Sequence, residues 1–184
     1  GLNTRSNSMN SQDSIKEQKR MGLGMMILAW VVFLGLGILF FGDVLEKQFN
    51  PNQRLDTQYS KAGMREVVLQ RNKFGHYVTS GTINGQPVTF MLDTGATGVA
   101  IPEAIARKLD IPRGRPYRTQ TANGISTSYA ASLDSVAVGE IELRDVQAGI
   151  APGLAMNQIL LGMTFLKHIE FTQRGDTLIL RQYL

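Results

Sequence analysis

One uncharged stretch near the start of the chain, residues 21–42, limits how this protein can fold. It reads MGLGMMILAWVVFLGLGILFFG and holds no charged side chain over 22 residues. As a helix, which rises about 1.5 Å per residue, it spans roughly 33 Å, enough to cross a hydrocarbon core of about 30 Å. A buried core helix is rarely this long or this apolar on every face. Residues 21–42 therefore predict a transmembrane helix.

A cleaved secretory signal is the alternative interpretation of this stretch. The apolar region of a signal usually has about 7–15 residues and ends in a small-x-small cleavage site. Here the run passes through Leu39, Phe40 and Phe41 into Gly42 and Asp43 without a convincing site. This favours an uncleaved anchor.

The charges that flank the stretch predict its orientation. Lys16, Lys19 and Arg20 form a tight cluster before it, whereas Lys47 and Arg54 follow it more sparsely. Because Lys and Arg favour the cytoplasmic side, we expect a cytoplasmic N-terminus and a C-terminal part across the membrane.

Composition excludes several classes of protein. The chain has no Cys, which rules out a disulfide scaffold, a thiolate zinc site and a cysteine nucleophile, and it has only two His. Nothing resembles a phosphate-binding loop or a nucleic-acid motif. We expect no metal, no cofactor and no nucleic-acid partner.

The chain carries a net charge of +4, and five of its basic residues form a cluster after a predicted helix. They are Arg107, Lys108, Arg113, Arg115 and Arg118. A solvated surface is the simpler interpretation of this cluster, and contact with anionic lipid or an acidic substrate is the alternative.

The remaining chain divides into a polar tail, a linker and a β-rich domain. Residues 1–20 are rich in Ser, Asn and Gln and predict disorder, and residues 43–63 read as a juxtamembrane linker. Residues 64–184 carry many short alternating segments, which indicate an all-β barrel or sandwich. Asn84-Gly85 and Asn123-Gly124 are hairpin signals. Further hairpins are expected at Gly139-Glu140 and at residues 173–176, and short helices at Pro102–Leu109 and Met163–Lys167.

The most distinctive chemistry lies at Asp93. This carboxylate follows Phe90-Met91-Leu92 directly and precedes Thr94 and Gly95, so it emerges at a strand end into a turn. An Asx turn that closes a strand is the simpler interpretation. A catalytic carboxylate is the alternative, and three residues alone do not decide between the two.

Two further motifs strengthen the catalytic interpretation. An apolar run followed by glycine, ILLGMTFL, occupies residues 159–166, and a hairpin with the sequence TANGIST occupies residues 121–127. Together with FMLDTGAT at residues 90–97, they resemble in order and spacing the retropepsin-like aspartic proteases, the family of retroviral proteases and of bacterial membrane-anchored relatives. The resemblance covers about residues 74–182. It implies an all-β fold, a closed barrel that corresponds to half of an acid protease, with one or two short helices.

The resemblance also implies a mechanism. Aspartic proteases need two facing carboxylates that share one proton. This chain has one Asp-Thr-Gly sequence, so the second carboxylate must come from Asp93 of another copy, which makes the expected partner a second copy of the chain. Asp93, Thr94 and Gly95 would form the catalytic loop.

Other roles follow from the same resemblance. Thr97 would support the catalytic loop, and Leu161 and Gly162 would pack beneath it. The flap hairpin would close over an extended peptide. The expected substrate-binding residues are Ala96, Ala122, Asn123, Gly124 and Ile125.

The sequence thus predicts a homodimeric aspartic endopeptidase anchored in a bacterial inner membrane through residues 21–42, with a periplasmic protease domain. The alternative is a membrane-tethered module of the same fold that dimerises or binds extended peptides without cleaving them. A third interpretation is a lipid- or polymer-associated scaffold that acts through the basic cluster.

Overall fold

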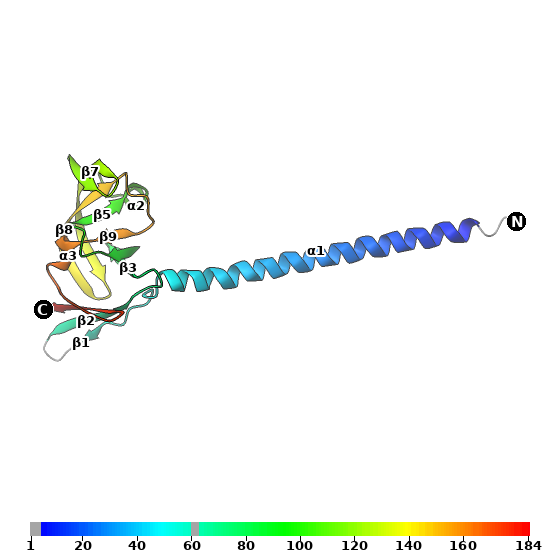
Figure 1. Ribbon diagram of the computed structural model, residues 1–184, viewed down its shortest axis with the longest axis horizontal. Helices are drawn as coiled ribbons and strands as arrows, with labels where there is room; N and C mark the ends of the chain where they lie inside the picture. Colours follow the sequence, from blue (N-terminus) through cyan, green and yellow to red (C-terminus); the bar gives the residue numbers. More distant parts are fainter. Residues whose placement is uncertain (1–4, 60–62) are drawn as a thin grey trace. The chain divides into compact units, whose positions relative to one another are not determined.

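The structure is a computed structural model that describes residues 5–59 and 63–184. It divides into two compact units, Gly1–Leu45 and Glu46–Leu184. Helix α1 (Arg5–Phe49) provides the first unit, and its last four residues begin the second (Figure 1). Within α1, Ser14–Phe49 is long and apolar enough to cross a membrane by length and composition, with a mean hydropathy of 2.5 over an 18-residue window.

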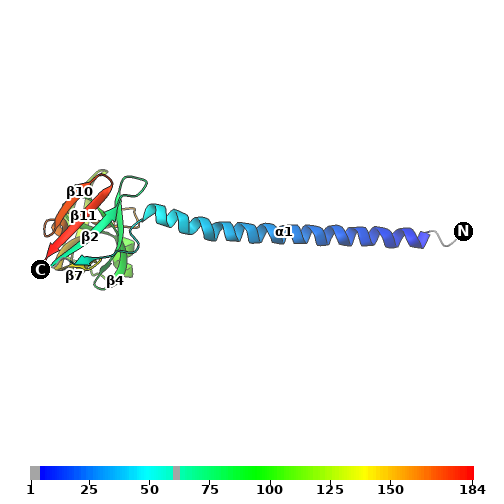
Figure 2. The ribbon, with the colours of Figure 1, turned by 90° about the horizontal axis from the view of Figure 1, so that it is seen from below.

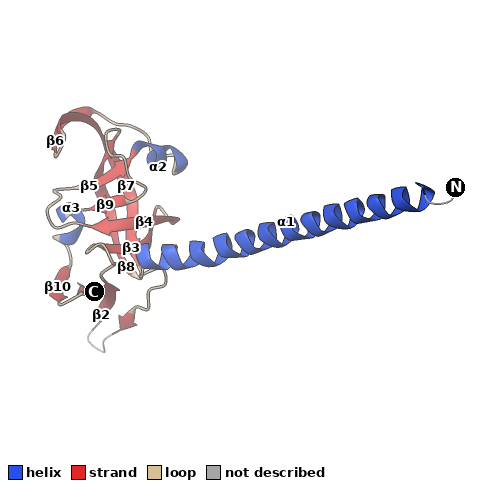
Figure 3. Ribbon diagram, turned by 45° about the vertical axis from the view of Figure 1, so that its right-hand side comes forward, coloured by secondary structure: helices blue, strands red, loops and turns tan. Residues whose placement is uncertain are grey.

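The second unit is built around a seven-stranded sheet that closes on itself (Figure 3). Its order is β3-β4-β9-β5-β8-β7-β6, and β3 also pairs with β7 at Thr82↔Ala137 and Ile83↔Val136, which joins the two ends of the ring. β6 stays outside the ring as an extension of β7. The strands are β3 (Tyr77–Ile83), β4 (Gln86–Leu92), β5 (Val99–Pro102), β6 (Pro116–Thr121), β7 (Gly124–Val138), β8 (Ile141–Ala151) and β9 (Ile159–Leu161).

A four-stranded antiparallel sheet adjoins this barrel. It has the order β1 (Gln58–Tyr59), β2 (Met64–Gln70), β11 (Thr177–Tyr183) and β10 (Glu170–Arg174). Figure 2 shows β2, β11 and β10 side by side. The C-terminal strand β11 therefore has a partner on both of its edges within this chain.

Alternating apolar residues fill the core of the second unit, as expected of strands with one buried face. Phe90, Ile159 and Leu161 come from the barrel, and Leu69 and Leu180 from the adjoining sheet; all five are fully buried. Two short helices cover the rest of the core, α2 (Glu103–Lys108) and α3 (Met163–Leu166).

This architecture confirms the predicted fold class: mostly β with two short helices and a long apolar helix before them. The predicted hairpins are present at Asn84-Gly85, Asn123-Gly124 and Gly139-Glu140. Two strands expected at residues 125–131 and 133–138 form the single strand β7, because the alternation of buried Ala131 and Leu133 with exposed neighbours continues without a break.

The predicted tail and linker both differ from the structure. Residues 5–20 are helical, because extending an existing helix costs much less than starting one; residues 1–4 lie outside the described residues. In the expected linker, residues 43–49 continue α1, and the compact unit begins at Glu46 rather than at Met64. The physical reason is that Asn50 and Asn52 are buried and hydrogen-bonded to the β domain.

Candidate active site

Asp93 lies at the first position after β4, where the chain leaves the barrel. β4 runs parallel to β9, with Leu92 opposite Leu161, and the Asp93 amide donates to the Leu161 carbonyl oxygen at 3.2 Å. The Asp93 side chain is exposed. The apolar residues of β4 thus lead the carboxylate out of the core to the surface.

A tight turn fixes the Asp93 carboxylate. The Gly95 amide donates to Oδ1 of Asp93 at 2.8 Å, and the Ala96 amide donates to the Asp93 carbonyl oxygen at 3.2 Å. This is the Asx turn that the sequence suggested as the simpler interpretation. The turn holds the carboxylate in one orientation at the surface, which also suits a reactive group.

The loop after Asp93 rests on the segment that follows β9. The amides of Met163 and Thr164 donate to the carbonyl oxygens of Ala96 and Thr97 at 2.9 and 3.0 Å. Gly162 is fully packed here: a Cβ at this position would lie 2.5 Å from the Ala96 oxygen and would also strike the Gly98 oxygen. The structure therefore brings Ala96, Thr97, Leu161 and Gly162 together beneath the Asp93 turn.

The predicted flap is the hairpin of β6 and β7, which extends beyond the ring of the barrel (Figure 3). Thr121 pairs with Gly124, and the Thr121 hydroxyl donates to the Gly124 carbonyl oxygen at 2.7 Å. Ala122 and Asn123 are exposed in the turn, and Ile125 beside them is 66% exposed. These residues lie together at the hairpin tip, apart in the chain from the Asp93 loop.

Two features of the β domain were missed by the sequence analysis. Tyr117 of β6 places its hydroxyl where a side chain on Gly149 of β8 would lie. The Thr164 hydroxyl is buried, with no hydrogen-bond partner in the structure, and a Cβ on Gly98 would lie 3.9 Å from it. Neither feature has a local signal, because each depends on segments that are distant in the sequence. Strand β5 was missed as well, although Val99-Ala100-Ile101 is an apolar run that could have indicated it.

A pocket of about 250 Å³ lies between β8 and α3, and Asp93 is not among its lining residues. It is lined by residues 143–147 with Thr164, Lys167 and His168. Within residues 5–59 and 63–184, no group of three or more His, Asp or Glu side chains could hold a metal ion.

The comparisons with known proteins agree with this geometry. Residues 79–168, which span β3 to α3, match the family model described as gag-polyprotein putative aspartyl protease. The chain is similar to the crystal structure of a retropepsin-like aspartic protease from Rickettsia conorii, with 27% identity and a TM-score of 0.55 over 70% of this chain and 94% of that one.

Two curated relatives are also similar. An uncharacterized protein in the cobV 5' region of Sinorhizobium sp is 35% identical over 123 residues, which is 65% of this chain and 53% of that protein. The uncharacterized protein RP867 of Rickettsia prowazekii is 32% identical over 119 residues, 62% of this chain and 51% of that protein. The chain thus spans about half the length of the curated relatives it matches.

The closed barrel, the Asp-Thr-Gly turn on β4 and the glycine after β9 define an aspartic protease half-domain. With the matches above, residues 79–168 and the fold of the β domain are those of the retropepsin-like aspartic proteases.

Proposed function

We propose that this protein is a membrane-anchored aspartic endopeptidase whose active site forms when two copies bring their Asp93 carboxylates face to face. The observation that carries the proposal is the Asp93 turn. One exposed carboxylate, fixed by the Gly95 amide at 2.8 Å and supported from below by Gly162, is half of a two-carboxylate site.

The two carboxylates would divide the chemistry between them. Like charges a few ångströms apart do not both ionise easily, so the pair holds one proton and titrates as a unit. The ionised Asp93 takes a proton from water as the water oxygen attacks the scissile carbonyl carbon. The protonated Asp93 of the other copy donates to the carbonyl oxygen. When the tetrahedral intermediate collapses, the Asp93 that took the proton from water passes it to the leaving amine and the C–N bond breaks. The Asp93 of the other copy takes a proton back from the hydroxyl of the intermediate, which becomes the carbonyl of the new carboxyl group.

The neighbouring residues would position the peptide. Thr94 would hydrogen-bond across the two-fold axis, and Gly95 and Ala96 would contact the substrate backbone. Thr97, Leu161 and Gly162 would keep the loop in place. The hairpin tip at residues 122–125 would close over the peptide and exclude water from the reacting bond.

Residues 21–42 would hold the enzyme in a bacterial inner membrane, with residues 1–20 in the cytoplasm and the β domain in the periplasm. The length of α1 and the mean hydropathy of 2.5 over an 18-residue window within it support the anchor, and the cluster at Lys16–Arg20 supports the orientation. Confinement to a membrane raises the effective concentration of protomers, which favours a weak dimer.

The test compares the full chain with Asp93→Asn in phospholipid nanodiscs, using a peptide library as substrate. Because the substitution removes both carboxylates of a dimer, the cleavage rate is expected to fall by at least about 10²–10⁴-fold. Asp134→Asn, at an exposed position on β7, is the matched control and should cleave as the wild type does. Full activity in Asp93→Asn would refute the proposal.

A mixing experiment tests the shared site. If both Asp93 residues of a dimer are needed, equal co-expression of wild type and Asp93→Asn leaves roughly one quarter of the protomers in active pairs, because partners combine at random. Activity proportional to the wild-type fraction would instead indicate that each copy works alone. Binding of peptides without any cleavage by the wild type would favour the non-catalytic module.

A further inference from the structure

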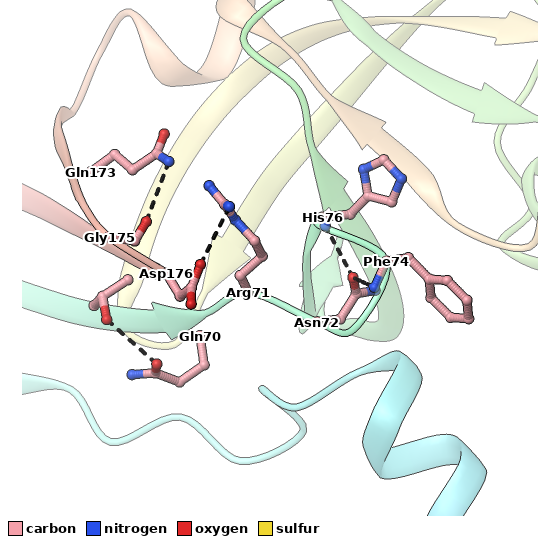
Figure 4. A network of polar contacts seen from close by, with 9 residues as sticks. Gln70, Arg71, Asn72, Phe74, His76, Gln173, Gly175 and Asp176 are labelled. Carbon is pink, nitrogen blue, oxygen red and sulfur yellow. Dashed lines mark hydrogen bonds and ion pairs between the residues drawn. The ribbon is translucent and has the colours of Figure 1, made fainter.

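The loop between β2 and β3, Arg71–His76, is held in one shape by a buried asparagine. Oδ1 of the Asn72 side chain accepts hydrogen bonds from the backbone N–H groups of Phe74 and His76, both at 3.0 Å (Figure 4). The backbone N–H of Asn72 donates to the His76 carbonyl oxygen at 2.8 Å. Asn72 itself is 7% exposed. The loop is therefore fixed by its own hydrogen bonds, and the side chains at its tip point outward.

The tip of this loop presents an aromatic ring and a cation to the solvent. Phe74 is 58% exposed, and Nζ of Lys73 lies 5.0 Å from the centre of its ring. The ring of Phe49 lies 6.4 Å away. We call Phe49, Lys73 and Phe74 the aromatic loop surface.

The same loop is hydrogen-bonded to Gln48 and Phe49, at the end of α1. Nδ2 of Asn72 donates to the Phe49 carbonyl oxygen at 2.9 Å, and Nζ of Lys73 donates to Oε1 of Gln48 at 2.7 Å. Phe49 and the loop are therefore one structural element within the second unit. A surface that contacts Phe49 is therefore also close to Phe74.

The covalent chain limits how far the aromatic loop surface can be from the apolar stretch. Seven residues separate Gly42 from Phe49, and α1 is helical through all of them. This places Phe49 about 10 Å along the helix axis beyond Gly42, the last residue of the uncharged stretch. The polar headgroup layers add roughly 10–15 Å in total to the hydrocarbon core of a bilayer. Each headgroup layer is therefore about 5–8 Å thick. If residues 21–42 span the core, Phe49 lies near the outer boundary of one such layer, and the aromatic loop surface is within reach of it.

We propose that Phe49, Lys73 and Phe74 dock in the phospholipid headgroup layer of the membrane that residues 21–42 cross. The inference rests on the membrane anchor of the proposed function and gives the β domain a second attachment to the bilayer. Segments that lie in the interface bury Phe side chains at the boundary between headgroups and acyl chains and keep Lys or Arg on the polar side. A lysine beside them places its charge where it can meet the lipid phosphates.

The neighbouring charges are consistent with this assignment. Arg71 at the base of the loop forms an ion pair with Asp176 at 3.3 Å, so that cation is already matched within the protein (Figure 4). Lys73 extends from the exposed tip instead, bonded to an amide oxygen rather than to a carboxylate. The Lys73 charge therefore stays available to an anionic lipid.

Tryptophan fluorescence tests the proposal in the full chain, because Trp30 is its only tryptophan and lies in the predicted span. Three chains are reconstituted into vesicles of phosphatidylethanolamine and phosphatidylglycerol that contain brominated lipid, with bromine either near the headgroup or near the bilayer centre. They are the wild type, Trp30→Phe with Phe74→Trp, and Trp30→Phe with Tyr59→Trp. Tyr59 is the matched control: it is 63% exposed and pairs with Arg65, about 20 Å along β2 from Arg71.

We expect the Phe74→Trp chain to lose emission to shallow bromine more than to deep bromine, with a blue shift relative to lipid-free detergent. The Tyr59→Trp chain should lose little to either. No quenching in Phe74→Trp, while Trp30 of the wild type is quenched, would overturn the docking and leave the anchor intact. An unquenched Trp30 would refute the anchor and the docking together.

A second copy of the chain is the competing occupant. If it covered the surface, the Phe74→Trp emission would shift with protein concentration in detergent and resist brominated lipid, which would also overturn the proposal. Equal quenching of Phe74→Trp and Tyr59→Trp would mean that the domain lies on the bilayer without a specific surface, and would overturn it as well. Because Phe74 is exposed in the wild type, the substitution leaves the core packing unchanged.

Discussion

Gly162 and Ala96 are in backbone contact beneath the Asp93 turn. The backbone N–H of Met163, the residue after Gly162, donates to the Ala96 carbonyl oxygen at 2.9 Å. A Cβ on Gly162 would lie 2.5 Å from the same oxygen. The loop that carries the carboxylate therefore rests on a position without a side chain. Any side chain there must move the loop or the start of α3.

We predict that Gly162→Ala lowers the free energy of unfolding by about 1–3 kcal/mol, because overpacking a closed contact forces backbone shifts. It should also reduce peptidase activity through displacement of the Asp93 loop. Urea unfolding and the peptide assay measure the two effects.

Gly98→Ala is the control for this substitution. A Cβ on Gly98 would meet only the Thr164 side chain, at 3.9 Å, which is ordinary contact. Its unfolding free energy should stay within about 0.5 kcal/mol of the wild type, as for substitutions away from strained features. Equal losses in both variants would show that the close approach is not the cause.

Asn52 is predicted to be essential for the stability of the β domain. Its Nδ2 donates to the carbonyl oxygens of Gln70 and Val78, at 2.8 and 2.7 Å, and its Oδ1 accepts from the Gln70 amide at 2.7 Å. Asn52→Ala leaves these backbone groups without their partner at a position that is 3% exposed. Since each unsatisfied buried group costs about 1–3 kcal/mol, we expect a loss of at least about 3 kcal/mol in urea unfolding.

A truncation pair gives a second measure of the same prediction. A chain that starts at Glu46 keeps Asn50 and Asn52 and should unfold cooperatively, whereas one that starts at Gln53 should not. As a control, Asn123→Ala at the exposed turn of β6 and β7 should change stability little. A cooperative transition of equal midpoint in both truncated chains would contradict the role of Asn52.

The structural role of Asn52 could not be predicted from the sequence. The segment Asn50-Pro51-Asn52 has the composition of a linker, yet Asn52 takes the place of a strand neighbour, since its amide group offers a donor and an acceptor as a peptide unit does. Nothing local distinguishes such a residue from a solvated one. The partners lie 18 and 26 residues away, on the ends of β2 and β3.

Local features, in contrast, were predictable. The Asn84-Gly85 turn follows from the positive φ of both residues, +51° and +77°, which Asn and Gly tolerate best. The position of Asp93 at a strand end follows from the three apolar residues before it. The support of that loop by β9 was suggested by the glycine at 162, but β5, which pairs with β9 and leads away from the loop, was missed because it is short.

The C-terminal strand predicts a specific pH dependence. Glu170 on β10 lies opposite Arg181 on β11, and its carboxylate accepts from the Tyr183 hydroxyl at 2.8 Å and from Arg181 at 3.0 Å. The pKa of Glu170 is lowered below its ordinary value of 4.5. The hydrogen bond from Tyr183 is the largest cause, and the hydrogen bond from Arg181 is the next. A carboxyl whose pKa is lower in the folded state stabilises the fold above the unfolded pKa, and this contribution is lost as the pH falls through the folded one.

We therefore expect the wild type to lose stability below about pH 4.5 partly through Glu170, and Glu170→Gln to lack that part of the acid-side slope in urea unfolding. Tyr183→Phe removes the largest cause of the shift and should move the Glu170 carboxyl titration, followed by NMR, toward its ordinary value. An unchanged titration in Tyr183→Phe would contradict the assignment.

The last prediction concerns the base of the flap. The Tyr117 hydroxyl of β6 occupies the space above Gly149 of β8, and the Tyr117 Cζ would lie 3.3 Å from a Cβ placed there. Because the obstructing group is the far end of a movable side chain, Gly149→Ala should displace Tyr117 at a cost of about 1 kcal/mol or less rather than unfold the barrel.

Tyr117→Phe removes the hydroxyl that meets the new methyl group, so it should restore part of the loss when combined with Gly149→Ala. The double-mutant cycle is expected to give a coupling energy of about 0.5–1 kcal/mol, in the range found for residues in contact. If the Tyr117 contact also positions the hairpin that ends in Ile125, Gly149→Ala should raise KM more than it lowers kcat, and the double variant should reverse the change in KM. Additive stabilities in the cycle would mean that the two side chains do not compete for this space in solution.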